Sequence, residues 1–220
     1  MKNPIKKITT EENNLIKKQK KDLLLYWLNS QLVINESVLQ AFKSVQREFF
    51  VDSSYRDLSY SDQPLPIDSG QTISQPTTVI IMLQLLNVFP ENHVLEIGTG
   101  SGYNAALLAK IARSVVTIER HKKLAKQALK NLKKSNLTKV KVIEGDGKLG
   151  YKNLAPYDRI IVTAAANQVP ESLKSQLRLG GLLVAPIGPT FGCEMLKIKK
   201  ISPNNFQTSS HGLFSFVPLK

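Results

Sequence analysis

The sequence predicts an α/β fold, in which N-terminal helices precede a doubly wound, mostly parallel sheet covered by helices. Three observations predict this fold. Short apolar runs alternate with segments of helical period between residues 94 and 185. The first run ends in a glycine-rich turn, and acidic residues follow the next two runs. Because open α/β sheets bind ligands at the carboxyl ends of their strands, the functional site is expected at that edge.

An amphipathic helix is predicted over residues 11–32, with lysines on one side and apolar residues on the other. The apolar side consists of Leu15, Ile16, Leu23, Leu24, Trp27 and Leu28. The lone tryptophan is expected to pack this helix against the sheet domain. We therefore assign residues 1–33 to a basic amphipathic N-terminal helical segment and residues 34–220 to the domain that carries the site.

The later elements follow in order from turn signals and from the two periodicities. Asn35 is a suitable N-cap for a second helix, and residues 52–72 are rich in turn formers and predict irregular structure. Pro76 suits the first turn of a third helix that reaches Leu86. Helices are then predicted over residues 104–112, 124–132 and 171–177. Strands are predicted over residues 94–97, 115–118, 140–143, 158–163 and 182–185, and at the sheet edge over residues 195–201 and 213–217.

The chain is strongly basic. It has 30 lysine and arginine residues against 17 aspartate and glutamate residues, a formal net charge of +13. Such an excess raises the question of nucleic-acid binding. The cations are mostly scattered lysines, without an arginine-rich tract, interleaved aromatic residues or zinc-finger spacing. Solvated helix faces explain this pattern better, so no specific nucleic acid is expected as a partner.

Composition also limits the class of protein. No apolar run approaches the roughly 20 residues of a membrane-spanning helix, and the first residues lack the apolar core of a secretory signal. A single cysteine, Cys193, rules out an intrachain disulfide and a clustered thiolate metal site. We expect a cytoplasmic protein with no membrane partner and no metal ion.

A glycine-rich turn follows the first predicted strand. Gly98, Gly100 and Gly102 let the chain turn tightly and bring bare backbone amides against a ligand at the start of a helix. By itself, such a turn also occurs as a tight loop without a ligand. A dinucleotide-binding turn would place glycine where this chain has Tyr103. The G-x-G-x-G spacing resembles the first motif of S-adenosylmethionine-dependent methyltransferases, whose fold is Rossmann-like.

Acidic residues extend this candidate cofactor site. Glu119 ends the second strand where a ribose diol would meet a carboxylate, the alternative being a surface acid after a buried strand. Asp146 either bonds the adenine amino group or only stabilises a turn. Glu96 is either a satisfied strand-end acid or, as we favour, orients the cofactor's amino group and the loop amides. The residues expected to bind the cofactor are Glu96, Gly98, Thr99, Gly100, Ser101, Gly102, Glu119, Asp146, Gly147 and Thr163.

Further segments are particular to one family. The segment GQTISQP lies at residues 70–76, FVPL lies at residues 216–219, and REFFV at residues 47–51 accompanies them. On these segments and the glycine-rich turn, residues 34–220 resemble the protein-L-isoaspartate O-methyltransferase family. Residues 34–220 are then the methyltransferase domain, with a sheet of the S-adenosylmethionine methyltransferase type.

The resemblance implies an activity and a set of roles. S-adenosylmethionine would methylate the free carboxylate of L-isoaspartyl residues in damaged proteins and peptides, and the ester would close to a succinimide that returns some normal aspartate. Ser74 would be the catalytic residue that holds the carboxylate, with Thr72, Ile73 and Val217 contacting the substrate. Because a carboxylate has a pKa near 4, no strong general base is needed at neutral pH. A monomer is expected.

Several alternatives stay open on the sequence alone. Ser74, two positions before Pro76, is also a plausible helix cap. A methyltransferase of the same fold could act on another carboxylate in a modified peptide or on RNA, although residues 163–166 lack the Asn-Pro-Pro-Tyr motif of base-amine methyltransferases. A non-catalytic relative is less expected, because both motifs are intact. The chain also departs from the family pattern at Gln46 and at Asp68-Ser69, near the expected substrate side.

Overall fold

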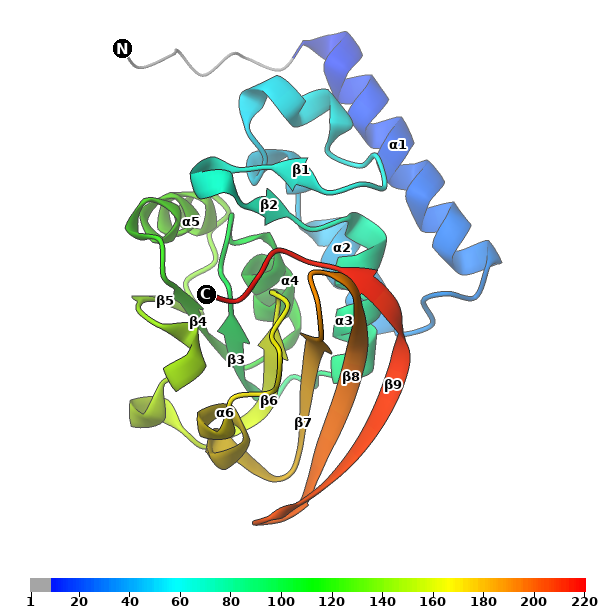
Figure 1. Cartoon of the computed structure of the whole chain (residues 1–220). Coiled ribbons are helices and arrows are strands. Elements are labelled where there is room, and N and C mark those ends of the chain that lie inside the picture. The colour runs from blue at the N-terminus through cyan, green and yellow to red at the C-terminus, as the bar shows by residue number, and fades with distance from the viewer. Residues whose placement is uncertain (1–8) are drawn as a thin grey trace.

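The computed structural model describes residues 9–220, and its centre is a seven-stranded sheet (Figure 1). The strands are β3 (His93–Ile97), β4 (Ser114–Glu119), β5 (Val140–Glu144), β6 (Tyr157–Val162), β7 (Leu177–Ile187), β8 (Phe191–Ser202) and β9 (Asn205–Ser215). Their order is β5-β4-β3-β6-β7-β8-β9, with parallel pairing from β5 to β7 and antiparallel pairing of β8 and β9. The predicted doubly wound, mostly parallel α/β fold is confirmed.

The strand order reverses at β3. This strand pairs in parallel with β4 on one side and with β6 on the other. The chain therefore leaves β3 toward one neighbour and reaches the other only later, which opens a crevice at the carboxyl end of β3. The glycine-rich turn, Glu119 and Thr163 all lie at this end.

Helices cover both faces of the sheet. The helices of the described residues are α1 (Thr10–Asn29), α2 (Glu36–Ser44), α3 (Pro76–Leu86), α4 (Tyr103–Ile111), α5 (Lys122–Lys134) and α6 (Glu171–Gln176). One face packs against α2, α3 and α4 through side chains such as Val94 and Val184. The opposite face packs against α6 through side chains such as Leu95. Because both faces are removed from water, the central strands consist mainly of apolar residues.

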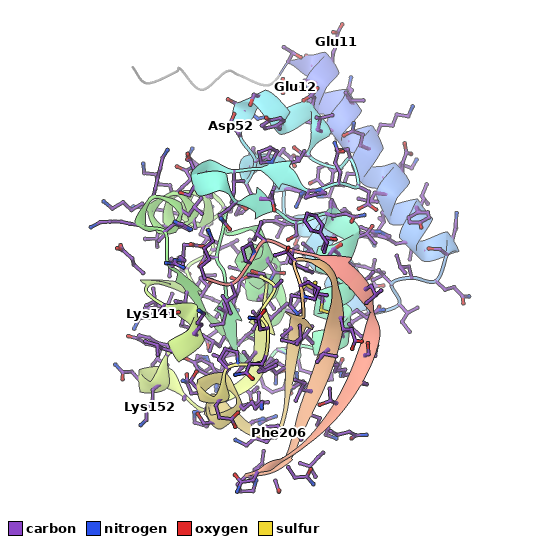
Figure 2. All side chains as sticks on the ribbon, in the orientation of Figure 1. Glu11, Glu12, Asp52, Lys141, Lys152 and Phe206 are labelled. Carbon is purple, nitrogen blue, oxygen red and sulfur yellow. The ribbon has the colours of Figure 1, made fainter. Side chains whose placement is uncertain are left out.

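The predicted helix starts are confirmed at α2 and α3. The Asn35 side chain accepts a hydrogen bond from the backbone N–H of Val38, and Pro76 is the first residue of α3. At α1, Thr9 and Glu12 form a capping box, and the helix begins at Thr10, one residue before the start expected from the sequence. Figure 2 shows Glu12 at this end of α1.

Residues 52–72 form short irregular structure, as predicted. They contain the short 3-10 helices η2 (Ser53–Leu58) and η3 (Asp68–Gly70) and the strands β1 (Leu65–Pro66) and β2 (Thr72–Ile73). The two strands pair antiparallel, and in Figure 1 this hairpin lies above the carboxyl end of β3. The remaining 3-10 helices of the described residues are η1 (Arg47–Phe49), η4 (Gly147–Leu149) and η5 (Lys152–Leu154).

Helix α1 departs from the prediction on its apolar side. Ile16, Leu23 and Trp27 are buried, whereas Leu15 and Leu28 are 45% and 44% exposed. The expectation that Leu15 and Leu28 share the buried side was wrong, because the buried residues recur at spacings of seven and four and form a narrower stripe.

The predicted packing role of Trp27 is confirmed. Its ring meets Phe42 of α2 edge-on at 4.6 Å between centroids, and its Nε1 donates a hydrogen bond to Thr77 Oγ1 of α3 at 2.8 Å. Helix α1 is thereby fixed to two helices of the sheet domain. The first residues of the predicted basic segment, 1–8, lie outside the described residues, and the division after residue 33 stays a prediction.

Most lysines of α1 and α5 lie on the solvent sides of these helices, whereas Lys20 is half-buried and donates to the Lys43 and Val45 carbonyl oxygens. Lys17, Lys18 and Lys21 of α1 and Lys126 and Lys130 of α5 are all exposed. The expectation of solvated basic helix faces is confirmed for these two helices. Within residues 9–220, no helix is long and apolar enough to span a bilayer.

The last three strands are longer than predicted. Strand β7 begins at Leu177, which the sequence placed at the end of a helix, and it continues past Gly180, whose φ is 72°. The predicted strand over residues 213–217 instead ends at Ser215. Strand β9 is exposed at nearly every position, so it lacks the apolar alternation that a search for period two detects. Figure 2 shows Phe206 toward the far tip of the hairpin that β8 and β9 form.

Candidate active site

A cavity lies at the carboxyl end of β3. The predicted site residues that line it are Thr72, Ile73, Ser74, Gly98, Thr99, Gly100, Ser101, Glu119, Gly147, Thr163 and Val217. Glu96, Gly102 and Asp146 do not line it. The fold thus brings segments from three parts of the chain to one cavity, with the glycine-rich turn at its floor and the β2 hairpin on the opposite side.

The glycine-rich turn needs its glycines for geometric reasons. Gly98, Gly100 and Gly102 have φ angles of 94°, 54° and 89°, which side chains disfavour. At Gly98 an added Cβ would also lie 2.5 Å from Thr163 Oγ1. That hydroxyl donates a hydrogen bond to the Gly98 carbonyl oxygen at 2.8 Å. Gly102, by contrast, allows close packing on α5, since an added Cβ would lie 3.3 Å from Ala128.

Glu119 lies at the end of β4, as predicted, and its carboxylate is held by backbone groups. One oxygen accepts the N–H of Gly100 at 2.9 Å, and the other accepts the N–H of His121 at 2.9 Å. The side chain is buried and lines the cavity. Its position beside the glycine-rich turn fits the expected contact with a ribose, and that role stays a prediction.

Glu96 points beneath the loop rather than into the cavity. It is fully buried, and its two oxygens accept hydrogen bonds from Asn104 Nδ2 at 2.7 Å and from Thr117 Oγ1 at 2.6 Å. The Thr117 hydroxyl also bonds the Thr99 hydroxyl of the turn. No loop amide is among its partners in the described residues. Burial raises the pKa of Glu96 to about 7, although the two hydrogen bonds favour the ionised form.

Asp146 makes the contact of a turn residue. Its Oδ1 accepts a hydrogen bond from the backbone N–H of Lys148, and Asp146 thereby caps η4. Its neighbour Gly147 lines the cavity and leaves no room for a side chain, because a Cβ there would overlap with Ile97. The contact with adenine that the sequence suggested for Asp146 stays a prediction.

Ser74 lies where the cavity meets a second, open groove. Thr72, Ser74, Val217 and Pro218 line both spaces. The helix-cap alternative for Ser74 is wrong, because Gln75 is the N-cap residue of α3 and makes no side-chain cap bond. A ligand in the cavity and a second ligand in the groove would therefore meet beside the Ser74 segment.

Asp62 takes over the capping of α3. Its Oδ1 accepts the backbone N–H of Thr77 at 2.9 Å, and its Oδ2 accepts the Thr77 hydroxyl at 2.6 Å. A carboxylate near a helix N-terminus also interacts favourably with the helix dipole. The Ser74 side chain is thus left free of a role at the helix start.

The C-terminal segment closes the cavity beside the end of β6. Ala165 donates its N–H to the Val217 carbonyl oxygen at 2.8 Å and accepts the N–H of Leu219 at 2.7 Å. This short parallel bridge places Val217 and Pro218 against the strand end of β6. The sequence treated residues 216–217 as the end of a strand, whereas they cross the edge of the sheet.

Comparison with known proteins decides the family. The family model of protein-L-isoaspartate(D-aspartate) O-methyltransferase (PCMT) matches residues 18–220. The chain belongs to this family. The protein-L-isoaspartate O-methyltransferase of Staphylothermus marinus is 48% identical over 198 residues, which cover 86% of this chain and 88% of that protein. That of Roseobacter denitrificans is 40% identical over 201 residues, which cover 91% of this chain and 94% of that protein.

A solved structure supports the same conclusion. The crystal structure of a Plasmodium falciparum protein-L-isoaspartate O-methyltransferase, in complex with S-adenosyl-L-homocysteine, is similar with a TM-score of 0.80 and 26% identity. The similarity covers 91% of this chain and 97% of that one. The family match begins inside α1, so it reaches further toward the N-terminus than the resemblance seen in the sequence.

Sequence reasoning missed Asn104 as a site residue. Asn104 lines the cavity, and because its Nδ2 donates to Glu96, its Oδ1 is the atom left to accept a hydrogen bond. That oxygen is buried and has no partner within the described residues. A polar residue at the start of the helix after the turn was the only available signal, and it reads equally well as an ordinary helix residue.

The departures from the family pattern lie outside the cavity. Asp68 forms an ion pair with Lys123 of α5 at 2.5 Å, and Ser69 adopts a left-handed φ of 62°. Gln46 is exposed just before η1. None of these three lines the cavity or the groove. No cluster of potential metal ligands occurs within the described residues.

The buried carboxyl of Glu96 predicts a pH dependence of stability. Because the fold raises its pKa from 4.5 to about 7, the protonated form is favoured in the native state. Its contribution to stability is therefore fully present below about pH 4.5 and is lost as the pH rises toward 7. The loss amounts to about 3 kcal/mol.

We expect Glu96→Gln to remove this loss, because an amide carries no charge at any pH. Urea denaturation of both proteins at pH 4.5 and pH 7.5 measures it. The free energy of unfolding of the variant, relative to that of the parent protein, should be higher at pH 7.5 than at pH 4.5. Parallel pH profiles would show that Glu96 titrates normally in the fold.

Proposed function

We propose that this chain transfers a methyl group from S-adenosylmethionine to the free carboxylate of L-isoaspartyl residues in proteins and peptides, and so initiates their repair through a succinimide. The observation that carries the proposal is the family match over residues 18–220, in which the glycine-rich turn and the Ser74 segment line one cavity. The function and the cofactor expected from the sequence agree with the names of the relatives and with the ligand of the similar structure.

The residues of the cavity fit this cofactor. The bare backbone of the turn, Glu119 and Asn104 line a space between β3 and the hairpin, and the buried Asn104 Oδ1 has no partner within the described residues. When bound, S-adenosylmethionine supplies an electrophilic methyl group on a sulfonium. Glu119 would hold the ribose hydroxyls, and Asn104 Oδ1 would accept from the ammonium group of the methionine moiety. The ribose hydroxyls and the ammonium group of the cofactor would thus each have a separate partner in the protein.

Ser74 is the residue that would hold the substrate carboxylate. The carboxylate is already an anion at neutral pH, so the protein has no proton to remove. What the site must do is align the carboxylate oxygen with the methyl carbon and exclude water, which can lower a barrier by about 7–11 kcal/mol in favourable cases. Thr72, Ile73 and Val217 would form the wall that excludes water around the Ser74 hydroxyl.

The open groove beyond Ser74 suits a polypeptide. It extends between α3 and the end of β9, and none of the described residues that line it is charged. Apolar side chains at its rim, Phe191 and Leu213, are 83% and 70% exposed. An extended segment of peptide would cover them and bring its carboxylate to the junction at Ser74.

Two further properties stay proposals. We propose a cytoplasmic protein, because its single cysteine is typical of a reducing compartment. We also propose a monomer without a specific nucleic-acid partner. Light scattering at several protein concentrations would test the monomeric state.

The decisive experiment compares two peptides that differ only in the linkage of one residue. With labelled S-adenosylmethionine, we expect rapid methylation of the L-isoaspartyl peptide and almost none of the aspartyl peptide, because only one linkage places a free carboxylate at Ser74. Equal methylation of both would favour action on another carboxylate, and transfer to RNA alone would overturn the proposal.

The role of Ser74 predicts a loss of turnover without a loss of cofactor. We expect Ser74→Ala to lower kcat by about ten- to a hundredfold, because one hydrogen bond to a charged group is lost in the reacting geometry. Calorimetry should find an unchanged affinity for S-adenosylhomocysteine. Ser61→Ala is the control, since it removes a hydroxyl that donates to the Leu58 carbonyl oxygen and lines neither the cavity nor the groove. A Ser74→Asn enzyme with the parent turnover would refute the role.

The role of Asn104 predicts a change that depends on the ligand. We expect Asn104→Leu to weaken S-adenosylhomocysteine binding by about ten- to a hundredfold, because a charged donor loses its acceptor. Binding of 5′-methylthioadenosine, which lacks the amino-acid end, should stay within about threefold. The control is Asn131→Leu, because Asn131 Nδ2 supports the turn from outside through the Ser101 carbonyl oxygen at 3.0 Å. Equal weakening of both ligands by Asn104→Leu would assign Asn104 a purely structural role.

A further inference from the structure

Arg47 is a fully buried arginine beneath the Ser74 segment. Burial lowers its pKa to about 10, so the guanidinium remains protonated at neutral pH. None of the ion pairs within the described residues includes it, and its Nη1 has no hydrogen-bond partner there. A buried charge without a paired carboxylate is costly. Its presence at this place therefore points to a task that an apolar side chain could not perform.

The contacts of Arg47 join three segments of the chain, of which those of Ser74 and Tyr103 line the cavity. Its Nε donates to the Ser59 carbonyl oxygen at 2.7 Å, and its Nη2 donates to the Ser74 carbonyl oxygen at 2.9 Å. The guanidinium lies 4.9 Å from the centroid of the Tyr103 ring, a cation–π arrangement. Tyr103 is the first residue of α4, directly after the glycine-rich turn.

These contacts connect the segment proposed to hold the substrate with the turn proposed to hold the cofactor. Ser74 belongs to the segment that would hold the substrate, whereas Tyr103 ends the turn that would hold the cofactor. The rigid, planar guanidinium bonds the first and packs on the second. A shift of the Ser74 segment relative to the turn would therefore strain a charge-assisted hydrogen bond or the ring contact.

We propose that Arg47 is a positioning residue that sets the distance between the Ser74 hydroxyl and the methyl group of the bound cofactor. It acts through the Ser74 backbone and does not touch the reacting atoms. The proposal rests on the role proposed above for Ser74. A misplacement of about 1 Å costs roughly a hundredfold in rate, which gives this single side chain a large effect on turnover.

Arg159 offers a matched control for a purely structural role. It is 6% exposed, its Nε donates to the Asn87 carbonyl oxygen at 2.9 Å, and its Nη1 donates to the Asp158 carbonyl oxygen at 2.9 Å. Its guanidinium also lies over an aromatic ring, that of Phe89, at 5.8 Å. It lines neither the cavity nor the groove beside Ser74. The two arginines thus share burial and contacts but differ in location.

The test compares Arg47→Lys with Arg159→Lys in the full chain. A lysine keeps the charge but cannot bond two carbonyl groups in the fork geometry of arginine. For Arg47→Lys we expect kcat for an isoaspartyl peptide to fall by about ten- to a hundredfold, with S-adenosylhomocysteine affinity within about threefold of the parent. For Arg159→Lys we expect kcat to stay within about twofold after correction for the folded fraction.

Combination with Ser74→Ala separates positioning from stability. If Arg47 acts through Ser74, the double variant should be no slower than the slower of the two single variants, because both remove the same alignment. Multiplying losses, or equal kcat for Arg47→Lys and Arg159→Lys, would overturn the proposal. Should Arg47→Lys not fold, Arg47→Gln keeps one donor and is measured in the same way.

The activity of the parent protein distinguishes a failure of the proposed function from a failure of the positioning role of Arg47. A parent protein that does not methylate the isoaspartyl peptide contradicts the proposed function, whatever the variants do. An active parent protein whose Arg47 variants match the Arg159 control contradicts only the positioning role.

Discussion

The site depends on how the loop after β3 is held. Strand β3 lies between β4 and β6, and each neighbour provides one side chain at its carboxyl end. Glu119 accepts the N–H of Gly100, and Thr163 donates to the Gly98 carbonyl oxygen. The loop is thus fixed from both sides before any ligand binds, which reduces the ordering cost of binding. The hairpin and the C-terminal segment then need only to be placed against this rigid floor.

Two buried ionisable groups border the cavity without entering it. Glu96 supports the turn through Asn104 and Thr117, and Arg47 supports the Ser74 segment through its carbonyl oxygen. In a low-dielectric interior such groups orient dipoles strongly, so a neutral amide or hydroxyl that faces the ligand can be held in one orientation. This explains how a site that needs no general base still relies on buried ionisable groups. The chemistry requires alignment, and alignment is what these groups provide.

The sequence was most informative where a requirement is local. The glycines of the turn, the Asn35 cap and Pro76 at a helix start depend on neighbouring residues alone, and the structure confirms these positions. The direction of Glu96 was not predictable, because it shares the sheet face of Val94 and meets α4 rather than the loop. The contacts of Arg47 were hidden too, since its partners lie 12 and 27 residues away along the chain.

The charge distribution suggests how the site can select the isoaspartyl linkage and still accept different flanking residues. The chain carries a net charge of +13, yet the described residues that line the open groove include no charged residue. A groove of this kind binds peptide through apolar contact and backbone groups, which depend little on the identity of flanking residues. The junction with the cavity places the Ser74 and Thr72 residues beside Val217, so we propose that the linkage is selected there. A repair enzyme needs this division, because damaged aspartyl sites share a carboxylate geometry and little else.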